Sequence, residues 1–259
     1  MHNLPGVRRI EHVMGMPVIA DVRDEGFDDE ILDEVFAWLR WVDETFSTYK
    51  DSSEISRLNR GELAVADLHP EVRAVLARCE ELRVATDGYF DLRAASPTAL
   101  DPSGLVKGWS IDRAGAILDL AGIRNYALNA GGDILLRGRA VPASGWRIGI
   151  QDPFRPDDVA RVIETGDLAI ATSGEYARGH HVLDPHAHEP PQGIVSVTIT
   201  GPDLATADAY ATAAFAMGHP RALHWTARLQ GYEGLLITAD DEVFSTPGFP
   251  AAAAATAAV

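Results

Sequence analysis

The sequence predicts an α+β protein, and three observations carry that prediction. Segments with apolar residues at intervals of three and four, which is helical spacing, lie on both sides of the middle of the chain. Short apolar segments separated by Gly, Pro and Asp, typical of strands, occupy the middle itself. Strands and helices do not alternate strictly, as they would in a parallel α/β sheet, so helices are expected to flank runs of strands.

The N-terminal half is predicted to begin with strands and continue with helices. Acidic residues stand at the beginning of the first helix, where the helix dipole favours negative charge. In order, the sequence predicts one or two strands over 7–24, a helix over 28–46, a polar stretch over 47–62 and a helix over 71–86. Over 100–122 it predicts a glycine-containing loop that runs into a helix ending at Gly122.

The C-terminal half is predicted to hold most of the strands. In order, we expect strands over 125–130, 133–138, 146–151, 160–165 and 168–173, a histidine-rich loop, a strand over 194–200, helices over 205–218 and 221–229, and strands over 234–239 and 242–246. No internal repeat and no Pro/Ser-rich linker divides the chain. A single domain over residues 7–246 is therefore expected, with residues 247–259 as a flexible, alanine-rich tail.

Composition and charge exclude several classes of protein. Of the 259 residues, 46% are apolar and 23% are charged, which excludes a collagen, a coiled coil and a mainly disordered chain. The formal charge of −16 repels a phosphate backbone, so no nucleic-acid partner is expected, and an anionic substrate would need a local lysine or metal ion. No segment approaches the roughly 20 apolar residues of a membrane span. We expect a cytoplasmic protein with no membrane partner.

Cys79 is the only cysteine, which excludes internal disulfides and a four-cysteine metal site. The densest group of possible metal ligands is instead a run of histidines with one carboxylate. Its members are His180, His181, Asp184, His186 and His188. Spacing alone is typical of a transition-metal site. However, Pro185 breaks any helix here, and adjacent histidines in an extended segment point to opposite faces. A loop with one functional histidine is favoured over a metal site or solvated histidines.

Two further features could bind ligands, one of them a phosphate group and the other Mg²⁺. The glycine-containing loop before the third helix, with Lys107, could present backbone N–H groups and a positive charge to a phosphate, or Lys107 could simply be a surface residue. Asp208 and Thr212 are four residues apart in a predicted helix and share a face. Their oxygen atoms suit Mg²⁺, although a buried hydrogen-bonded pair explains the same spacing.

A fourth feature is the segment from Asn129 to Asp133, whose two glycines allow the backbones of neighbouring strands to approach closely. Taken by itself it is typical of a plain turn. Eight segments, these included, resemble in the same order the motifs of the ApbE family of FAD:protein FMN transferases, over about residues 12–245. They are Met14-Gly15, FSTYKDSSEISRLN (46–59), DGYFD (87–91), DPSGLVKGWSID (101–112), NAGGD (129–133), TSGEY (172–176), HVLDP (181–185) and TADAYATAAFAMG (206–218).

The resemblance implies a fold, a substrate and a metal. The fold would be α+β and related to the T-fold, with two subdomains and FAD in the cleft between them. The ligands of a Mg²⁺ ion beside the FAD pyrophosphate would be Asp208, Thr212 and a backbone carbonyl at Gly104. The residues that contact FAD would be Met14, Tyr49, Tyr89, Phe90, Asp91, Asp101, Lys107 and the loop at Leu183.

The resemblance also implies a reaction, in which FMN passes from FAD to a Thr or Ser hydroxyl of an acceptor flavoprotein and AMP is released. His181 stands at the position of the family's functional histidine, and it and Asp208 would be the catalytic residues. The chain departs from the family pattern at Met16, Pro102 and His186-Ala187-His188, the last in place of an RTG-like turn. Alternative activities are Mg²⁺-dependent hydrolysis of FAD to FMN and AMP, FAD binding without catalysis, and zinc-dependent hydrolysis at the histidines.

Overall fold

A hairpin around Gly15 begins the larger of two sheets in the computed structural model, which describes residues 6–94, 96–155, 157–174 and 182–253. Within those ranges, eight strands pair antiparallel in the order β1-β2-β3-β4-β7-β8-β9-β10, and β5 pairs with β6 in a separate sheet. The strands are β1 (Val7–Val13), β2 (Met16–Val22), β3 (Tyr126–Ala130), β4 (Asp133–Arg137), β5 (Trp146–Gln151), β6 (Val159–Thr165), β7 (Leu168–Gly174), β8 (Ile194–Gly201), β9 (Glu233–Thr238) and β10 (Val243–Ser245).

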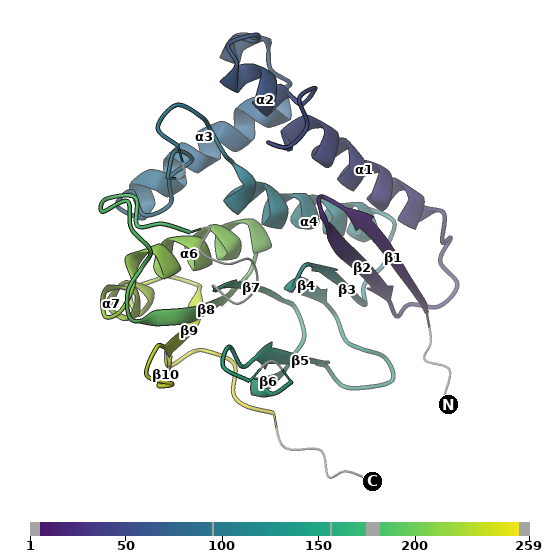
Figure 1. The fold of residues 1–259 in the computed structure, drawn as a ribbon. Coiled ribbons are helices and arrows are strands. Elements are labelled where there is room, and N and C mark those ends of the chain that lie inside the picture. The colour runs from purple at the N-terminus through teal and green to yellow at the C-terminus, as the bar shows by residue number, and fades with distance from the viewer. Residues whose placement is uncertain (1–5, 95, 156, 175–181, 254–259) are drawn as a thin grey trace.

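Helices cover one face of the large sheet in two layers (Figure 1). Helices α4 and α6 lie against the sheet, and α1, α2 and α3 form the outer layer, while the β5–β6 sheet lies on the opposite side. The helices are α1 (Ile31–Phe46), α2 (Glu54–Asn59), α3 (Pro70–Ala85), α4 (Ser103–Leu120), α6 (Leu204–Met217) and α7 (Arg221–Thr226), and a 3₁₀ turn, η1, spans Val65–Asp67. The α+β prediction is confirmed.

Apolar side chains that point alternately to the two faces of the large sheet fill a core on each face. On β4, Leu135 packs into the core beneath the helices, whereas Ile134 and Leu136 pack into a second core that includes Trp146 of β5. Successive side chains of a strand point to opposite faces, so a short apolar strand with both faces covered needs apolar residues at every position. Cys79 is buried in the helical core, as predicted.

Close packing of α4 against α6 sets the position of the site described below. A Cβ atom added at Gly108 of α4 would lie 2.4 Å from the Leu204 carbonyl oxygen, so the two backbones meet where only glycine fits. The Asp112 carboxylate accepts hydrogen bonds from the N–H groups of Leu204 and Ala205, at 2.9 and 2.8 Å. A side chain of one helix therefore caps the first turn of the other and fixes their relative register.

The structure corrects the sequence prediction in three places. The polar stretch over 47–62 contains a helix, α2, because Ser53 accepts a hydrogen bond from the Ser56 N–H as an N-cap and Ile55 is buried. The glycine-containing loop expected to carry Lys107 is mostly helical, because the Asp101 carboxylate accepts a hydrogen bond from the Ser103 N–H and α4 begins at Ser103. Helix α7 ends at Thr226 rather than at 229.

The C-terminal segment follows the second core for several residues. Phe249 is buried in it, and the N–H of Ala253 donates to the carbonyl of Val162 on β6 at 2.7 Å. The division into a domain over 7–246 and a tail from 247 stays a prediction. Among the described residues, the helices are too short or too polar to cross a membrane.

Candidate functional site

Asp208, Thr212 and Gly104, the three expected Mg²⁺ ligands, come together between α4 and α6. Asp208 is only 3% exposed, and one of its carboxylate oxygens, Oδ2, accepts a hydrogen bond from the Gly108 N–H at 3.2 Å. Thr212 lies one helical turn further along α6, and its Oγ1 is 3.4 Å from the Ser173 hydroxyl on β7. A Cβ atom added at Gly104 would lie 3.7 Å from Thr212 Oγ1, so this glycine lies next to the threonine hydroxyl.

Lys107 of α4 joins two buried carboxylates in this region. Its ammonium nitrogen forms an ion pair with Oδ2 of Asp133 and lies 3.4 Å from Oδ1 of Asp208. Burial raises the pKa of Asp208, and Asp133 adds to the increase, while the Lys107 charge opposes it. Two carboxylates facing one ammonium group favour the uptake of a further positive charge, either a proton on Asp208 or a cation beside it.

Asp133 is placed by the glycines of the NAGGD segment. Gly131 and Gly132 have φ angles of +59° and +103°, a conformation that favours glycine, and they close the two-residue turn between β3 and β4. Asp133 is the first residue of β4, and its Oδ1 accepts a hydrogen bond from the Thr172 N–H at 2.9 Å. The plain-turn interpretation of this segment describes its backbone, and the turn also delivers a carboxylate to Lys107.

The donor set at Asp208 and Thr212 fits Mg²⁺. A carboxylate, a hydroxyl and a backbone carbonyl are hard oxygen donors, which Mg²⁺ prefers over the nitrogen and sulfur donors typical of zinc sites. The Gly104 carbonyl lies in the first turn of α4, and a carbonyl oxygen has two lone pairs, so it can accept another partner besides a helix hydrogen bond. In the part of the chain that the structure describes, no group of three or more His, Cys, Asp or Glu side chains could hold a metal ion.

A cavity of about 600 Å³ opens beside Tyr89, which precedes Phe90 in the DGYFD segment. The Tyr89 hydroxyl accepts a hydrogen bond from Arg221, and the ring packs edge-on against His186 with 4.6 Å between centroids. The lining residues are Asp87, Tyr89, Asp184, His186, Ala187, Met217, Arg221, His224, Trp225 and Arg228. The next residue, Phe90, packs against α4, because its Cε2 would lie 3.1 Å from a Cβ atom added at Gly104.

Three other expected FAD contacts occupy turns near α4. Met14 has a φ angle of +55° in the β1–β2 turn, and its sulfur is 3.8 Å from the hydroxyl of Ser110, which donates to the Lys107 carbonyl. Asp101 caps the beginning of α4, and Asp91 accepts a hydrogen bond from the Arg93 N–H at 2.8 Å.

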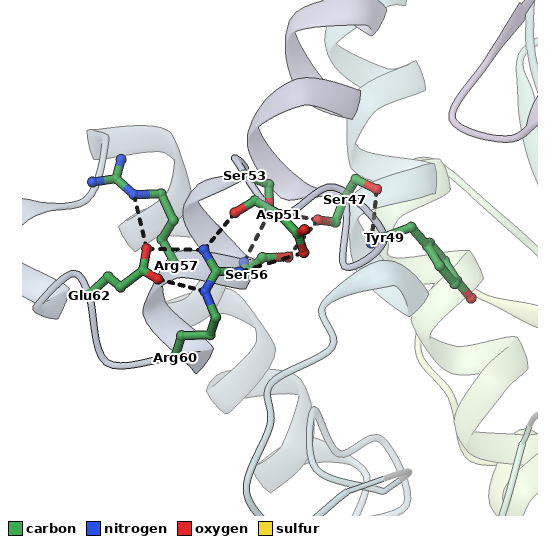
Figure 2. A network of polar contacts seen from close by, with 8 residues as sticks. All are labelled: Ser47, Tyr49, Asp51, Ser53, Ser56, Arg57, Arg60 and Glu62. Carbon is green, nitrogen blue, oxygen red and sulfur yellow. Dashed lines mark hydrogen bonds and ion pairs between the residues drawn. The ribbon is translucent and has the colours of Figure 1, made fainter.

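Tyr49 lies in the segment between α1 and α2 and is 96% exposed. Figure 2 shows its ring directed away from the polar network that orders this segment. In that network Ser53 donates to the Ser47 carbonyl, and Arg60 pairs with Glu62 at 2.7 Å. The Tyr49 ring is thus accessible to a planar ligand, but the structure does not bring it into the Asp208 cluster.

The histidine-rich segment is described only from residue 182 onward. His180 and His181 lie outside the described residues. Leu183 is half-buried, and His186 Nε2 is 3.0 Å from the carbonyl oxygen of Asp87. His186 therefore packs on the cavity wall, although its spacing within the sequence grouped it with possible metal ligands.

Sequence reasoning did not select two residues of the cluster, Asp133 and Ser173. Each lies in a segment that was singled out, NAGGD and TSGEY, but neither segment indicates which side chain points toward the helices, Asp133 to Lys107 of α4 and Ser173 to Thr212 of α6. The alternation from the glycine turn could have placed Asp133 on the helix-facing side of β4 only once the pairing of β3 with β4 was known.

The chain is similar to known proteins over most of its length. The model described as ApbE family matches residues 14–97 and 92–236. An FAD:protein FMN transferase of Vibrio cholerae serotype O1 is 37% identical over 134 residues, which is 48% of this chain and 40% of that protein. One of Rhodobacter capsulatus is 33% identical over 198 residues, or 70% of this chain and 38% of the relative. The chain thus spans about two fifths of the length of these curated relatives.

Solved structures show the same fold. The flavin transferase ApbE from Vibrio cholerae superposes with a TM-score of 0.84 at 25% identity, covering 94% of this chain and 97% of that one. The ApbE protein from Thermotoga maritima gives a TM-score of 0.85 at 23% identity, over 94% and 97% of the two chains.

Proposed function

This chain belongs to the ApbE family, and from that premise we propose that it is a Mg²⁺-dependent FAD:protein FMN transferase. The observation that carries the proposal is the grouping of Asp208 and Thr212 with the backbone of Gly104, beside Lys107. The acceptor would be a Thr or Ser hydroxyl of a flavoprotein, in the cytoplasm.

The reaction exchanges one phosphorus–oxygen bond for another. The acceptor hydroxyl oxygen attacks the phosphorus of the FMN half of FAD, the bond from that phosphorus to the bridging oxygen breaks, and AMP leaves with the bridging oxygen. His181 would take the hydroxyl proton as a general base. A bound Mg²⁺ supplies neutralisation of the charge on the non-bridging oxygens.

The residues of this chain have separate parts in that scheme. Asp208, Thr212 and the Gly104 carbonyl would hold the ion. Lys107 would act near the pyrophosphate while it remains paired with Asp133, which restrains its position. In a protein of formal charge −16, these local cations offset the repulsion that FAD phosphates would otherwise meet.

The remaining expected contacts would hold the rest of FAD. Buried Tyr89 lines the cavity, buried Phe90 lies beside Gly104, and exposed Tyr49 offers an aromatic face. The other proposed contacts with FAD are Met14, Asp91, Asp101 and Leu183.

Incubation with FAD, Mg²⁺ and a candidate acceptor domain tests the proposal. Flavin fluorescence that stays with the acceptor band in a denaturing gel is the expected result. The acceptor with its Thr or Ser changed to alanine is the control. Release of free FMN without labelling of any acceptor would indicate hydrolysis of FAD, and no change in FAD would indicate binding without catalysis.

A further inference from the structure

Asp133 is almost completely buried, at 1% exposure, and faces the same ammonium group as Asp208. Its two oxygens have different partners. Oδ1 accepts the Thr172 N–H from the neighbouring strand β7, and Oδ2 pairs with Lys107 Nζ. The backbone turn and the hydrogen bond to Oδ1 together hold Oδ2 toward α4.

Lys107 is shared unequally between the two carboxylates. Its Nζ is in direct contact with Asp133, whereas its distance to Asp208 Oδ1 is 3.4 Å, beyond ordinary hydrogen-bond length. The Lys107 side chain is only 19% exposed, so a paired carboxylate offsets part of the cost of removing its ammonium group from water. If Asp133 lost its charge, the Lys107 ammonium would be drawn closer to Asp208, and an ammonium paired with Asp208 competes with any metal ion for that oxygen.

We propose that Asp133 is a positioning residue for the cation site, which holds the Lys107 ammonium so that Asp208 stays available as a metal ligand. The inference rests on the proposed function, since it concerns the Mg²⁺ site at Asp208. It assigns to the NAGGD turn a task beyond connecting two strands, namely to place a counter-ion for Lys107.

Isothermal titration calorimetry of the full chain with Mg²⁺ alone tests this inference. Asp133→Asn should weaken Mg²⁺ binding by about tenfold or more, the range found when groups that orient a metal ligand are changed. The asparagine can still accept the Thr172 N–H, so the fold should be retained, as checked by circular dichroism. Asp152→Asn is the matched control, because Asp152 is also buried and accepts backbone N–H groups, but it lies beside β5.

A Lys107 variant distinguishes a positioning role of Asp133 from a simple loss of negative charge near the metal site. Asp133→Asn removes a nearby charge in any background, but it can release Lys107 toward Asp208 only when Lys107 is present. We therefore expect the loss of Mg²⁺ affinity to be several-fold smaller when the same change is made in Lys107→Met. Equal losses in both backgrounds, or unchanged binding by Asp133→Asn, would overturn the inference and leave the Mg²⁺ site standing. If the wild type and Asp208→Asn bind Mg²⁺ equally, the proposed site and the inference both fail.

Discussion

The Asp112 carboxylate on α4 accepts a hydrogen bond from the Leu204 N–H at the beginning of α6, at 2.9 Å. This contact joins the helix that carries Lys107 to the helix that carries Asp208. The catalytic arrangement proposed above therefore depends on a capping interaction one to two turns away from it.

Asp112 should give the stability of the protein a particular pH dependence. Burial raises the pKa of Asp112 to about 6, against an ordinary value of 3.8, although the hydrogen bonds that it accepts from two N–H groups act in the opposite direction. A raised pKa means that the folded protein binds the proton more tightly than the unfolded chain, so stability falls as the pH rises from about 4 to about 6. Asp112→Asn lacks this titration.

The stability advantage of the wild type over Asp112→Asn should therefore shrink across that pH interval. Urea unfolding of both proteins at pH 4, 5, 6 and 7 measures the difference directly. An advantage that grows with pH would mean that the folded-state pKa of Asp112 is lowered rather than raised.

Gly108 should be intolerant of even a methyl group. The added Cβ would lie 2.4 Å from the Leu204 carbonyl oxygen and 2.9 Å from the Ala205 Cα, and backbone atoms inside a packed helix pair cannot move aside cheaply. Gly108→Ala should lower the free energy of unfolding by about 1–3 kcal/mol. Gly149→Ala is the control, because its Cβ would meet only methyl groups of Val159, at 3.2 Å. Equal stability losses would contradict the close-approach argument.

The sequence predicts the larger part of the fold. The elements that it predicts wrongly depend on local contacts. The regular spacing of apolar residues predicted the helix ending at Phe46 and the strands around Gly15, because each of these elements buries one face. The six-residue helix α2 was not predicted, since it depends on the Ser53 cap and on burial of Ile55 rather than on a repeating pattern.

The site was predictable only in part, because its contacts cross the chain. Asp208 and Thr212 are neighbours on one helix, so spacing alone pairs them. Their approach to Gly104 depends on how closely α4 packs against α6, and Gly108 reveals that closeness only in three dimensions. The role of Asp133 depends on strand pairing at Ala130 and on its distance to Lys107, which no local pattern contains.

Asp208 should be essential for turnover but not for folding. Asp208→Ala removes a proposed metal ligand, so flavin transfer should fall at least about a hundredfold, comparable to the loss of a strong charge-stabilising group. Because Lys107 keeps Asp133 as a partner, the variant should remain folded. Transfer should be supported by Mg²⁺ or Mn²⁺, while Zn²⁺ should substitute poorly. Full activity of Asp208→Ala in EDTA would remove the metal from the proposal.

His181 should be the histidine on which transfer depends. If it accepts the proton of the acceptor hydroxyl, His181→Ala should lose FMN transfer but still bind FAD, as measured by quenching of flavin fluorescence. Transfer by the wild type should decline as the pH is lowered enough to protonate the imidazole, because the protonated ring cannot act as a base.

The neighbouring histidines provide matched controls for that experiment. His186 packs on Tyr89 and contacts the Asp87 carbonyl, so His186→Ala should alter the cavity wall and affect FAD affinity more than the rate of transfer. His188 is exposed, and His188→Ala should have a small effect on both. The variants are compared at saturating FAD and Mg²⁺ against one acceptor domain. If His186→Ala or His188→Ala lowers the rate as much as His181→Ala does, the histidines act as a unit, and a transition metal bound by them becomes the better explanation.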